Sequence, residues 1–201
     1  MPDLVQQMFD EWTLDKGPLE QRISVFNHIR DIPYRVVPEL GDLHEGPRRL
    51  IEFGCGSCTP KHFLLGHMFS RLDLLVKYVS FPYSWNQFQL AYPDDLRKLS
   101  ENLPIEYHLA CKVQIDNSWK FIDATWDMPL KRAGFPVNEF WDGVDNTLIA
   151  IDPIDQIEHS TAQERAEYVK NQKADWTEED RVRSAEFYER FNEWLTELRV
   201  Q

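Results

Sequence analysis

The sequence predicts an α+β fold, with helices at both ends and an antiparallel sheet between them. Three observations predict it: a helical apolar pattern over residues 19–29, a strand, turn and strand over residues 106–125, and a charged, helical C-terminal part. The 201 residues are 42% hydrophobic and 13% aromatic, which is enough to bury a full core. We therefore expect a single domain spanning 1–201, with an N-terminal helical portion (1–46), a core (47–150) and a C-terminal helical extension (155–201).

The first well-marked helix is expected after Pro18, because proline suits the first turn of a helix. The apolar residues that follow at roughly helical spacing are Leu19, Ile23, Phe26 and Ile29. Ile32 and Pro33 end this helix, and a connection over residues 37–47 leads to the next one.

A second helix is expected to begin at Cys58. Gly54 and Gly56 allow the chain to turn sharply before it, and Pro60 fits its first turn. Its buried side is predicted by apolar residues at helical spacing, namely Leu65, Met68, Phe69 and Leu72. His62 and His67 lie on this otherwise apolar helix, so we expect both to be buried and hydrogen-bonded.

Strands are expected at residues 74–79, 106–115 and 119–125. Asp116 and Asn117 can form a two-residue turn between the last two strands, because both residue types tolerate left-handed φ. Counting outward from that turn pairs Ala110 with Asp123 and puts His108 one diagonal step from Asp123, about 7 Å away on the same face. The opposite face is apolar and carries Leu109, Cys111, Val113 and Ile115, so Cys111 is predicted to lie in the core.

A long connection over residues 81–104 carries several aromatic side chains: Phe81, Tyr83, Trp85, Phe88 and Tyr92. Aromatic residues in such a loop either line a binding site or anchor the loop to the core. We take Tyr83 and Trp85 as candidate substrate-binding residues.

The C-terminal part is charged from Ser160 onward, and residues 177–180 form a capping box that opens the last helix. We expect this helix to pack on its own domain rather than on a partner. The stripe predicted to face inward is Val182, Ala185, Tyr188, Phe191, Leu195 and Leu198.

Cys58, His108 and Asp123 together suggest nucleophilic catalysis. A cysteine at a helix start is near the positive end of the helix dipole, which lowers the thiol pKa below its free value of roughly 8.5. The free N–H groups there can also hold a developing oxyanion. An imidazole then serves as base and acid, and a carboxylate orients it. The spacing of 15 positions puts His108 and Asp123 on one face of the hairpin.

These motifs resemble the core of the transglutaminase-like superfamily, whose members share a papain-like fold. Gly56-x-Cys58, His108 and Asp123-x-Thr125 match its Gly-x-Cys helix start, its His-strand and its Asp-x-Thr strand, in that order. Many members have an aromatic residue two positions after the histidine, where this chain has Ala110. The likeness covers roughly residues 47–125.

The resemblance implies thiol-dependent acyl transfer or amide and peptide hydrolysis through a thioester, with a peptide, protein or small amide as substrate. It implies no metal or organic cofactor, and the calcium loop of animal transglutaminases has no recognisable counterpart. Animal transglutaminases crosslink proteins within a large multidomain frame with a screened tunnel. These 201 residues have no room for such domains, so we expect a peptidase or amidase rather than a crosslinker.

Two alternative functions stay open at this point. Cys55-x-x-Cys58 is a possible redox dithiol or half of a zinc site, with His62 as third ligand and Cys111 or His67 as fourth. A thioredoxin-like site would need residues 50–53 to form a strand before this pair. A catalytically inactive transglutaminase-like binding module is the other alternative.

The net charge of −12 argues against nucleic acid or an anionic membrane as a partner, because both attract basic surfaces. The first seven residues, starting at Met1 and Pro2, lack a basic region leading into an apolar run. Three cysteines, an odd number, fit a reducing cytoplasm better than a disulfide scaffold. The expected location is therefore cytoplasmic, while the sequence does not indicate an oligomeric state.

Overall fold

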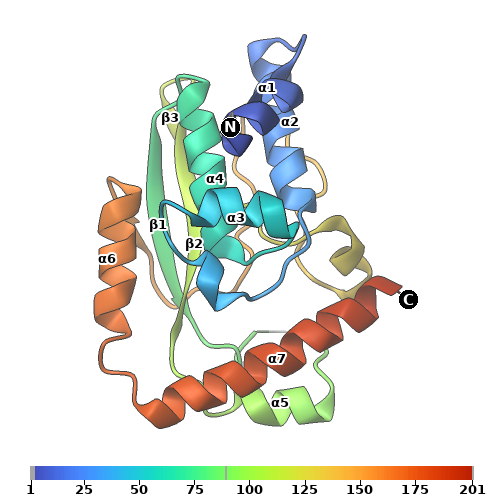
Figure 1. The fold of residues 1–201 in the computed structure, drawn as a ribbon, viewed down its shortest axis with the longest axis vertical. Coiled ribbons are helices and arrows are strands. Elements are labelled where there is room, and N and C mark those ends of the chain that lie inside the picture. Colours follow the sequence, from blue (N-terminus) through green and yellow to red (C-terminus); the bar gives the residue numbers. More distant parts are fainter. Residues whose placement is uncertain (1–2, 89, 201) are drawn as a thin grey trace.

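The computed structural model describes residues 3–88 and 90–200, so Met1 and Pro2 of the N-terminal segment lie outside the described residues. It has an α+β architecture, as predicted (Figure 1). The helices are α1 (Leu4–Thr13), α2 (Pro18–Asp31), η1 (Pro38–Leu40), α3 (Gly46–Phe53), α4 (Cys58–Arg71), α5 (Asp94–Ser100), η2 (Met128–Ala133), α6 (Ala162–Gln172) and α7 (Glu178–Val200). The strands are β1 (Val76–Tyr83), β2 (Glu106–Ile115), β3 (Ser118–Ile122) and β4 (Ile157–His159), paired antiparallel in the order β3-β2-β1-β4.

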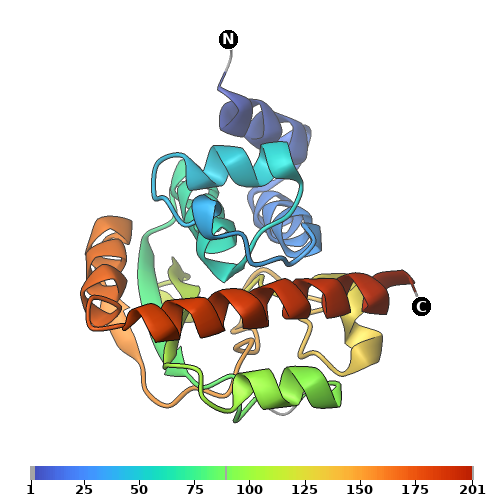
Figure 2. The same cartoon turned by 60° about the horizontal axis from the view of Figure 1, so that its bottom comes forward.

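Some of the helices form a layer against the sheet, and others lie around its end. Helices α2 and α4 pack together, and α4 packs on β2, so the cysteine-bearing helix lies on the antiparallel sheet as predicted. Helix α6 packs beside β1 and β4, and α7 crosses below the sheet with α5 beneath it (Figures 1 and 2). Within the two described ranges, no helix is both long and apolar enough to cross a membrane.

The β2–β3 hairpin has the predicted turn and register. Asp116 and Asn117 have φ values of 48° and 63°, the left-handed conformation that a tight hairpin turn requires. Ile115 pairs with Ser118 and Cys111 with Ile122, so Asp123 follows directly after the last paired residue. The turn therefore sets which residues come close at the other end of the hairpin.

The expected first strand and the loop after it need correction. The strand begins at Val76 and continues to Tyr83, so Phe81 and Tyr83 belong to β1 instead of a loop. Pro82 hid this continuation, because proline is rare inside strands; here it still pairs with Tyr107. The remaining connection also contains α5, which the sequence pattern did not reveal.

The last helix begins with the predicted capping box, in which the Asp180 N–H donates to Thr177 Oγ and the Asp180 carboxylate accepts from the Thr177 N–H. Its predicted inward stripe was wrong in part, because Val182 is 57% exposed. The buried residues of α7 are Ser184, Phe187, Phe191, Trp194 and Leu195. All of these except Ser184 pack in an aromatic cluster that includes Trp85 and Tyr92.

A fully buried lysine ties the site-bearing segments together. Lys61, on α4, donates from Nζ to the carbonyl oxygens of Arg30, Ile32 and Thr125 at 2.9, 2.9 and 2.7 Å. These three carbonyls belong to the end of α2 and to the segment just after Asp123. The Lys61 side chain therefore holds the cysteine helix and the aspartate segment in fixed relation.

Candidate active site

Cys58 is the first residue of α4, with Ser57 as the N-cap. The Ser57 side chain makes no capping hydrogen bond, and the first N–H that bonds back inside the helix is that of Lys61, to Ser57 O. Pro60 has no N–H, so the N–H groups of Cys58 and Thr59 stay outside the helical ladder. Two backbone donors thus lie at the sulfur-bearing end of the helix, an arrangement that can hold a negative charge.

His108 and Asp123 form a buried pair beside this helix start. His108 Nε2 lies 2.7 Å from Asp123 Oδ2, and both side chains are almost fully buried. His108 lies close enough to the Cys58 sulfur to lower the pKa of the thiol, and the Leu109 N–H acts in the same direction. Since Nε2 faces the carboxylate, Nδ1 is the nitrogen left for the sulfur. The three predicted residues therefore come together in the order thiol, imidazole, carboxylate.

The electrostatics of this group favour a charged pair. Burial would lower the pKa of His108, but the Asp123 carboxylate and the Cys58 sulfur outweigh burial and raise it to about 10. Burial likewise would raise the pKa of Cys58, but His108 lowers it below the usual value. Asp123 is ionised, because His108 holds its pKa below the usual range despite burial. The arrangement thus favours a thiolate beside an imidazolium.

His62 supports this group as a neutral histidine. Its Nε2 accepts from the Ala124 N–H at 3.0 Å, so its Nδ1 must carry the proton and donate to Cys58 O, 2.8 Å away. Burial lowers the pKa of His62 to about 4. The 3.5 Å approach of His62 Nε2 to Asp123 Oδ1 is therefore no ion pair. His62 is buried as predicted and joins the cysteine helix to the aspartate segment.

Arg165, on α6, is a site residue that the sequence did not indicate. It is 3% exposed, and its Nη2 donates to Thr59 Oγ1 at 3.2 Å and to Tyr107 O at 3.1 Å. These partners directly adjoin Cys58 and His108 in the chain, and the guanidinium helps to lower the pKa of Cys58. A single arginine in a charged helix gives no pattern that could have revealed this role.

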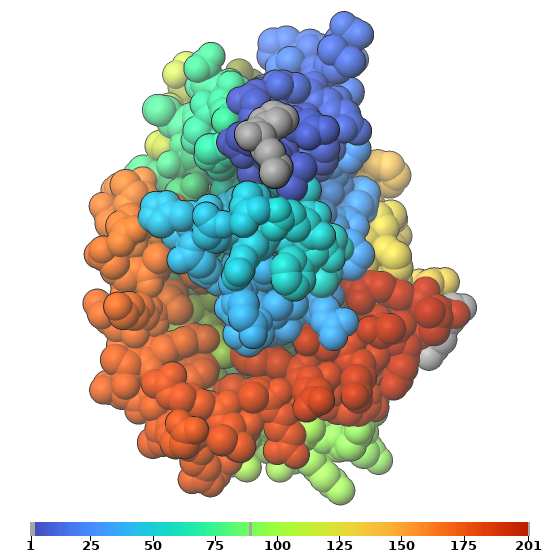
Figure 3. Space-filling model, in the orientation of Figure 1, coloured from blue at the N-terminus to red at the C-terminus, as the bar shows by residue number. Residues whose placement is uncertain are grey.

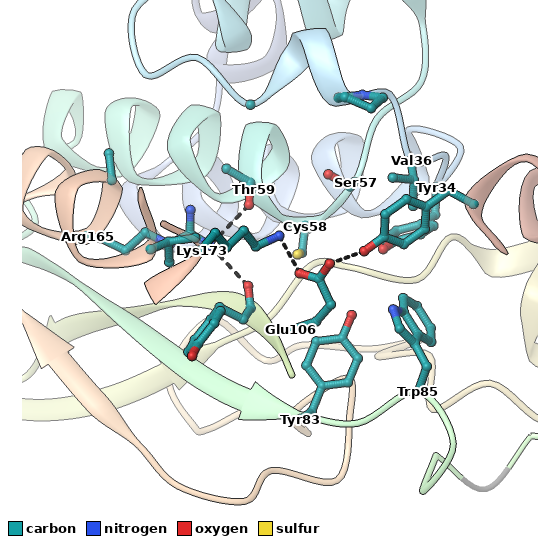
Figure 4. A pocket seen from close by; sticks show the side chains of 16 residues that line it. Tyr34, Val36, Ser57, Cys58, Thr59, Tyr83, Trp85, Glu106, Arg165 and Lys173 are labelled. Atoms are coloured by element: carbon teal, nitrogen blue, oxygen red, sulfur yellow. Dashed lines mark hydrogen bonds and ion pairs between the residues drawn. The ribbon is translucent and has the colours of Figure 1, made fainter. Parts of the chain in front are cut away.

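A cavity of about 310 Å³ opens at Cys58 (Figure 4). Its walls come from α4, the ends of β1 and β2, the segment after α2, and the helices α6 and α7. Tyr83 and Trp85, the candidate substrate-binding residues, both line it. The sequence missed Glu106, which projects into the cavity near the Cys58 sulfur (Figure 4). Its position two residues before His108 on a strand was the available signal, because such residues share a face.

The other candidate residues lie apart from this constellation. Cys111 is fully buried in the core as predicted, and its Sγ donates to His62 O. His67 was predicted to be buried but is exposed on α4, where its Nε2 accepts from Arg71 Nε. It falls outside the apolar side of the helix, which faces the sheet and α2.

The metal and redox alternatives find no support. Among the described residues, no three His, Cys, Asp or Glu side chains are grouped so that they could share a metal ion. Cys55, Cys58 and Cys111 are all free thiols. Residues 50–53, which a thioredoxin-like site would need as a strand, belong to helix α3.

Comparison with known proteins found solved structures of low similarity. No family model matches the chain, and no curated protein matches it. A structure described as a "Putative Cysteine Protease from Cytophaga hutchinsonii" matches with a TM-score of 0.44 and 14% identity, over 77% of this chain and 41% of that one. A "putative protease from Parabacteroides distasonis" matches with a TM-score of 0.39 and 14% identity, over 60% of this chain and 23% of that one. The chain spans less than half the length of either protein.

Proposed function

We propose that this chain is a cysteine hydrolase or acyltransferase with a transglutaminase-like catalytic core, acting through Cys58, His108 and Asp123. The observation that supports this proposal most is the buried series of thiol, imidazole and carboxylate. Its thiol end, Cys58, lines a cavity and lies next to helix N–H groups outside the helical ladder. A structural cysteine needs neither an imidazolium partner nor access to a cavity.

In the proposed reaction, the Cys58 thiolate attacks the carbonyl carbon of an amide, and the oxyanion is held by the N–H groups of Cys58 and Thr59. When the C–N bond breaks, His108 gives its proton to the leaving amine, and a thioester remains. Water then attacks the thioester while His108 takes one of its protons. The C–S bond breaks, the acid leaves, and the thiolate and imidazolium are restored. Asp123 orients the ring throughout.

The test is selective labelling followed by turnover. With iodoacetamide at neutral pH, we expect Cys58 to react much faster than Cys55 or Cys111 in peptide-level mass spectrometry, because it alone has an imidazolium partner. Cys58→Ala should abolish release of product from peptide and small amide substrates, whereas the matched Cys55→Ala should retain it. Equal labelling of Cys55 and Cys58, with no turnover, would contradict the proposal and leave an inactive binding module.

We further propose that hydrolysis is favoured over protein crosslinking. A lysine side chain from another protein would have to reach the thioester through a cavity of about 310 Å³ lined by aromatic residues. Water is small and present at its bulk concentration. In an assay with a glutamine-containing peptide and a labelled amine, free acid should exceed incorporated amine. The opposite ratio would overturn this preference and leave the proposed nucleophile intact.

A further inference from the structure

Glu106 is a buried carboxylate inside the same cavity. It is the first residue of β2 and lies two residues before His108 on the same face. On the neighbouring strand β1 it pairs with Tyr83. The side chain is 9% exposed, and its Oε2 accepts from Lys173 Nζ at 2.6 Å. Its Oε1 accepts from the Tyr188 hydroxyl. Figure 4 shows this carboxylate between the Cys58 sulfur and the ring of Tyr83.

Besides Cys58 and Glu106, the cavity lining carries two cationic side chains, Arg165 and Lys173, which differ in how firmly they are held. Arg165 is held by Thr59 and Tyr107 and is nearly inaccessible. Lys173 is the C-cap residue of α6, and its side chain is 31% exposed. The Lys173 ammonium can therefore regain water when another cation takes its place on Glu106, while Arg165 cannot move without breaking its bonds.

The surroundings of Glu106 suit a cation. Aromatic rings of Tyr34, Tyr83, Trp85 and Tyr188 line the cavity, and ring faces attract ammonium and guanidinium groups. Burial raises the pKa of Tyr34, Tyr83 and Tyr188, so these phenols are neutral. An uncompensated carboxylate in such a place is costly, so departure of Lys173 requires another positive charge.

We propose that the cavity recognises substrates whose acyl part carries a primary ammonium or guanidinium group, which replaces the Lys173 ammonium on Glu106. The exchange leaves the charge of the cavity unchanged. An anionic substrate would instead have to lie beside Glu106, while Arg165 already donates to two protein oxygens, Thr59 Oγ1 and Tyr107 O. This inference rests on the proposed function, because it names the substrate class of that site.

The test uses disulfide-forming probes of opposite charge and needs no turnover. Aminoethyl methanethiosulfonate and sulfonatoethyl methanethiosulfonate both transfer their thioalkyl group to a thiolate and release methanesulfinate. Their rates at Cys58 are measured by peptide-level mass spectrometry at physiological salt and divided by their rates with free cysteine. We expect a corrected cation-to-anion ratio above one in the wild type.

Variants then assign the ratio to Glu106. Glu106→Gln should lower it and Lys173→Met should raise it, each by about tenfold, as expected for one charge within a few ångströms at a partly buried site. Glu167→Gln and Lys170→Met are matched controls, since they make the same charge changes at exposed positions of α6. Both controls should leave the ratio within about twofold, because solvent screens exposed charges.

Protection of Cys58 by a small cation distinguishes binding in the cavity from a general electrostatic effect on the charged probes. Butylamine should protect Cys58 from iodoacetamide with a measurable Kd that tightens in Lys173→Met, whereas butanol should not protect. A wild-type ratio below one, or an unchanged ratio in both cavity variants, would overturn the inference. Slow labelling of Cys58 relative to Cys55 would instead count against the proposed function, since the charge ratio is independent of absolute rate. The Lys173→Met result keeps the test decisive even when Glu106→Gln fails to fold.

Discussion

Asp123→Asn should remove the thiolate–imidazolium pair of Cys58 and His108 while leaving most of the fold. The hydrogen bonds of Asp123 give the expected loss of stability. The carboxylate accepts three hydrogen bonds: Oδ2 from His108 Nε2 at 2.7 Å and from the Ala150 N–H at 2.8 Å, and Oδ1 from the Thr125 N–H at 3.1 Å. An asparagine that keeps its oxygen at the Oδ2 position points its NH₂ at the Thr125 N–H. Two donors then face each other, which costs about 1–3 kcal/mol.

The larger effect is on the Cys58 thiolate. Without the Asp123 charge the pKa of His108 falls, because burial then opposes the imidazolium and only the Cys58 sulfur still favours it. Less imidazolium stabilises less thiolate, so the pKa of Cys58 rises toward that of a free thiol. A thiol of pKa roughly 8.5 is only about 3% ionised at pH 7. We therefore expect iodoacetamide to label Cys58 of the variant up to about 30-fold more slowly at pH 7 than a fully ionised thiol.

The assay is the labelling rate of Cys58 from pH 5 to 10, together with urea unfolding. Asp123→Asn should move the midpoint of the labelling profile upward, and it should retain more turnover than Cys58→Ala, because Asp123 only orients and stabilises the imidazole. Asp145→Asn is the matched control, since that carboxylate is 72% exposed and pairs with Lys120. An unchanged pH profile in folded Asp123→Asn would refute the charged pair, and loss of folding would indicate a structural carboxylate.

Two more predictions concern charge at the same site. Arg165→Met should slow labelling of Cys58 at pH 7 by roughly three- to tenfold, because the guanidinium lowers the pKa of Cys58. Arg165→Lys should restore part of the rate. Equal rates in the wild type and both variants would contradict this prediction. The pKa of His108 is raised from 6.5 to about 10 on folding, so its stabilisation is complete below pH 6.5 and is lost as the pH rises through 10. The difference in unfolding free energy between wild type and His108→Asn should then shrink by about 3 kcal/mol between pH 7 and pH 10. A difference independent of pH in urea unfolding would exclude an imidazolium in the folded state.

The hairpin shows how much of the site could be predicted from sequence. A two-residue turn fixes the register of the strands on either side, so the turn at Asp116 and Asn117 determines the approach of His108 to Asp123. The helix start at Cys58 was equally local, because glycine and proline restrict the backbone on either side of it. Features set within about 20 residues of chain could therefore be predicted.

The remaining site residues depend on packing between distant segments. Arg165 meets Thr59 across 106 positions of sequence, and Tyr188 meets Glu106 across 82. No local periodicity specifies such contacts. The face of α7 was misjudged for a related reason, because the pattern treated Val182 as core, while the aromatic cluster selected Phe187 and Trp194. A long, polar helix has several apolar stripes of similar strength, and only the surface it meets decides among them.

The C-terminal helices are therefore better understood as walls of the site than as an appendage. Tyr188 and Lys173 hold Glu106, while Asn192 bonds to both the N–H and the C=O of Val36. Arg199 pairs with Asp127 and donates to Tyr34 O, so α7 fixes the segment after α2 on the far side of the cavity.

In the space-filling view, α6 and α7 border the segment after α2, and the cavity at Cys58 lies between these elements (Figure 3). The helices that supply Arg165 and Lys173 therefore also shape the cavity, so the proposed choice of substrate depends on how α6 and α7 pack against the rest of the chain.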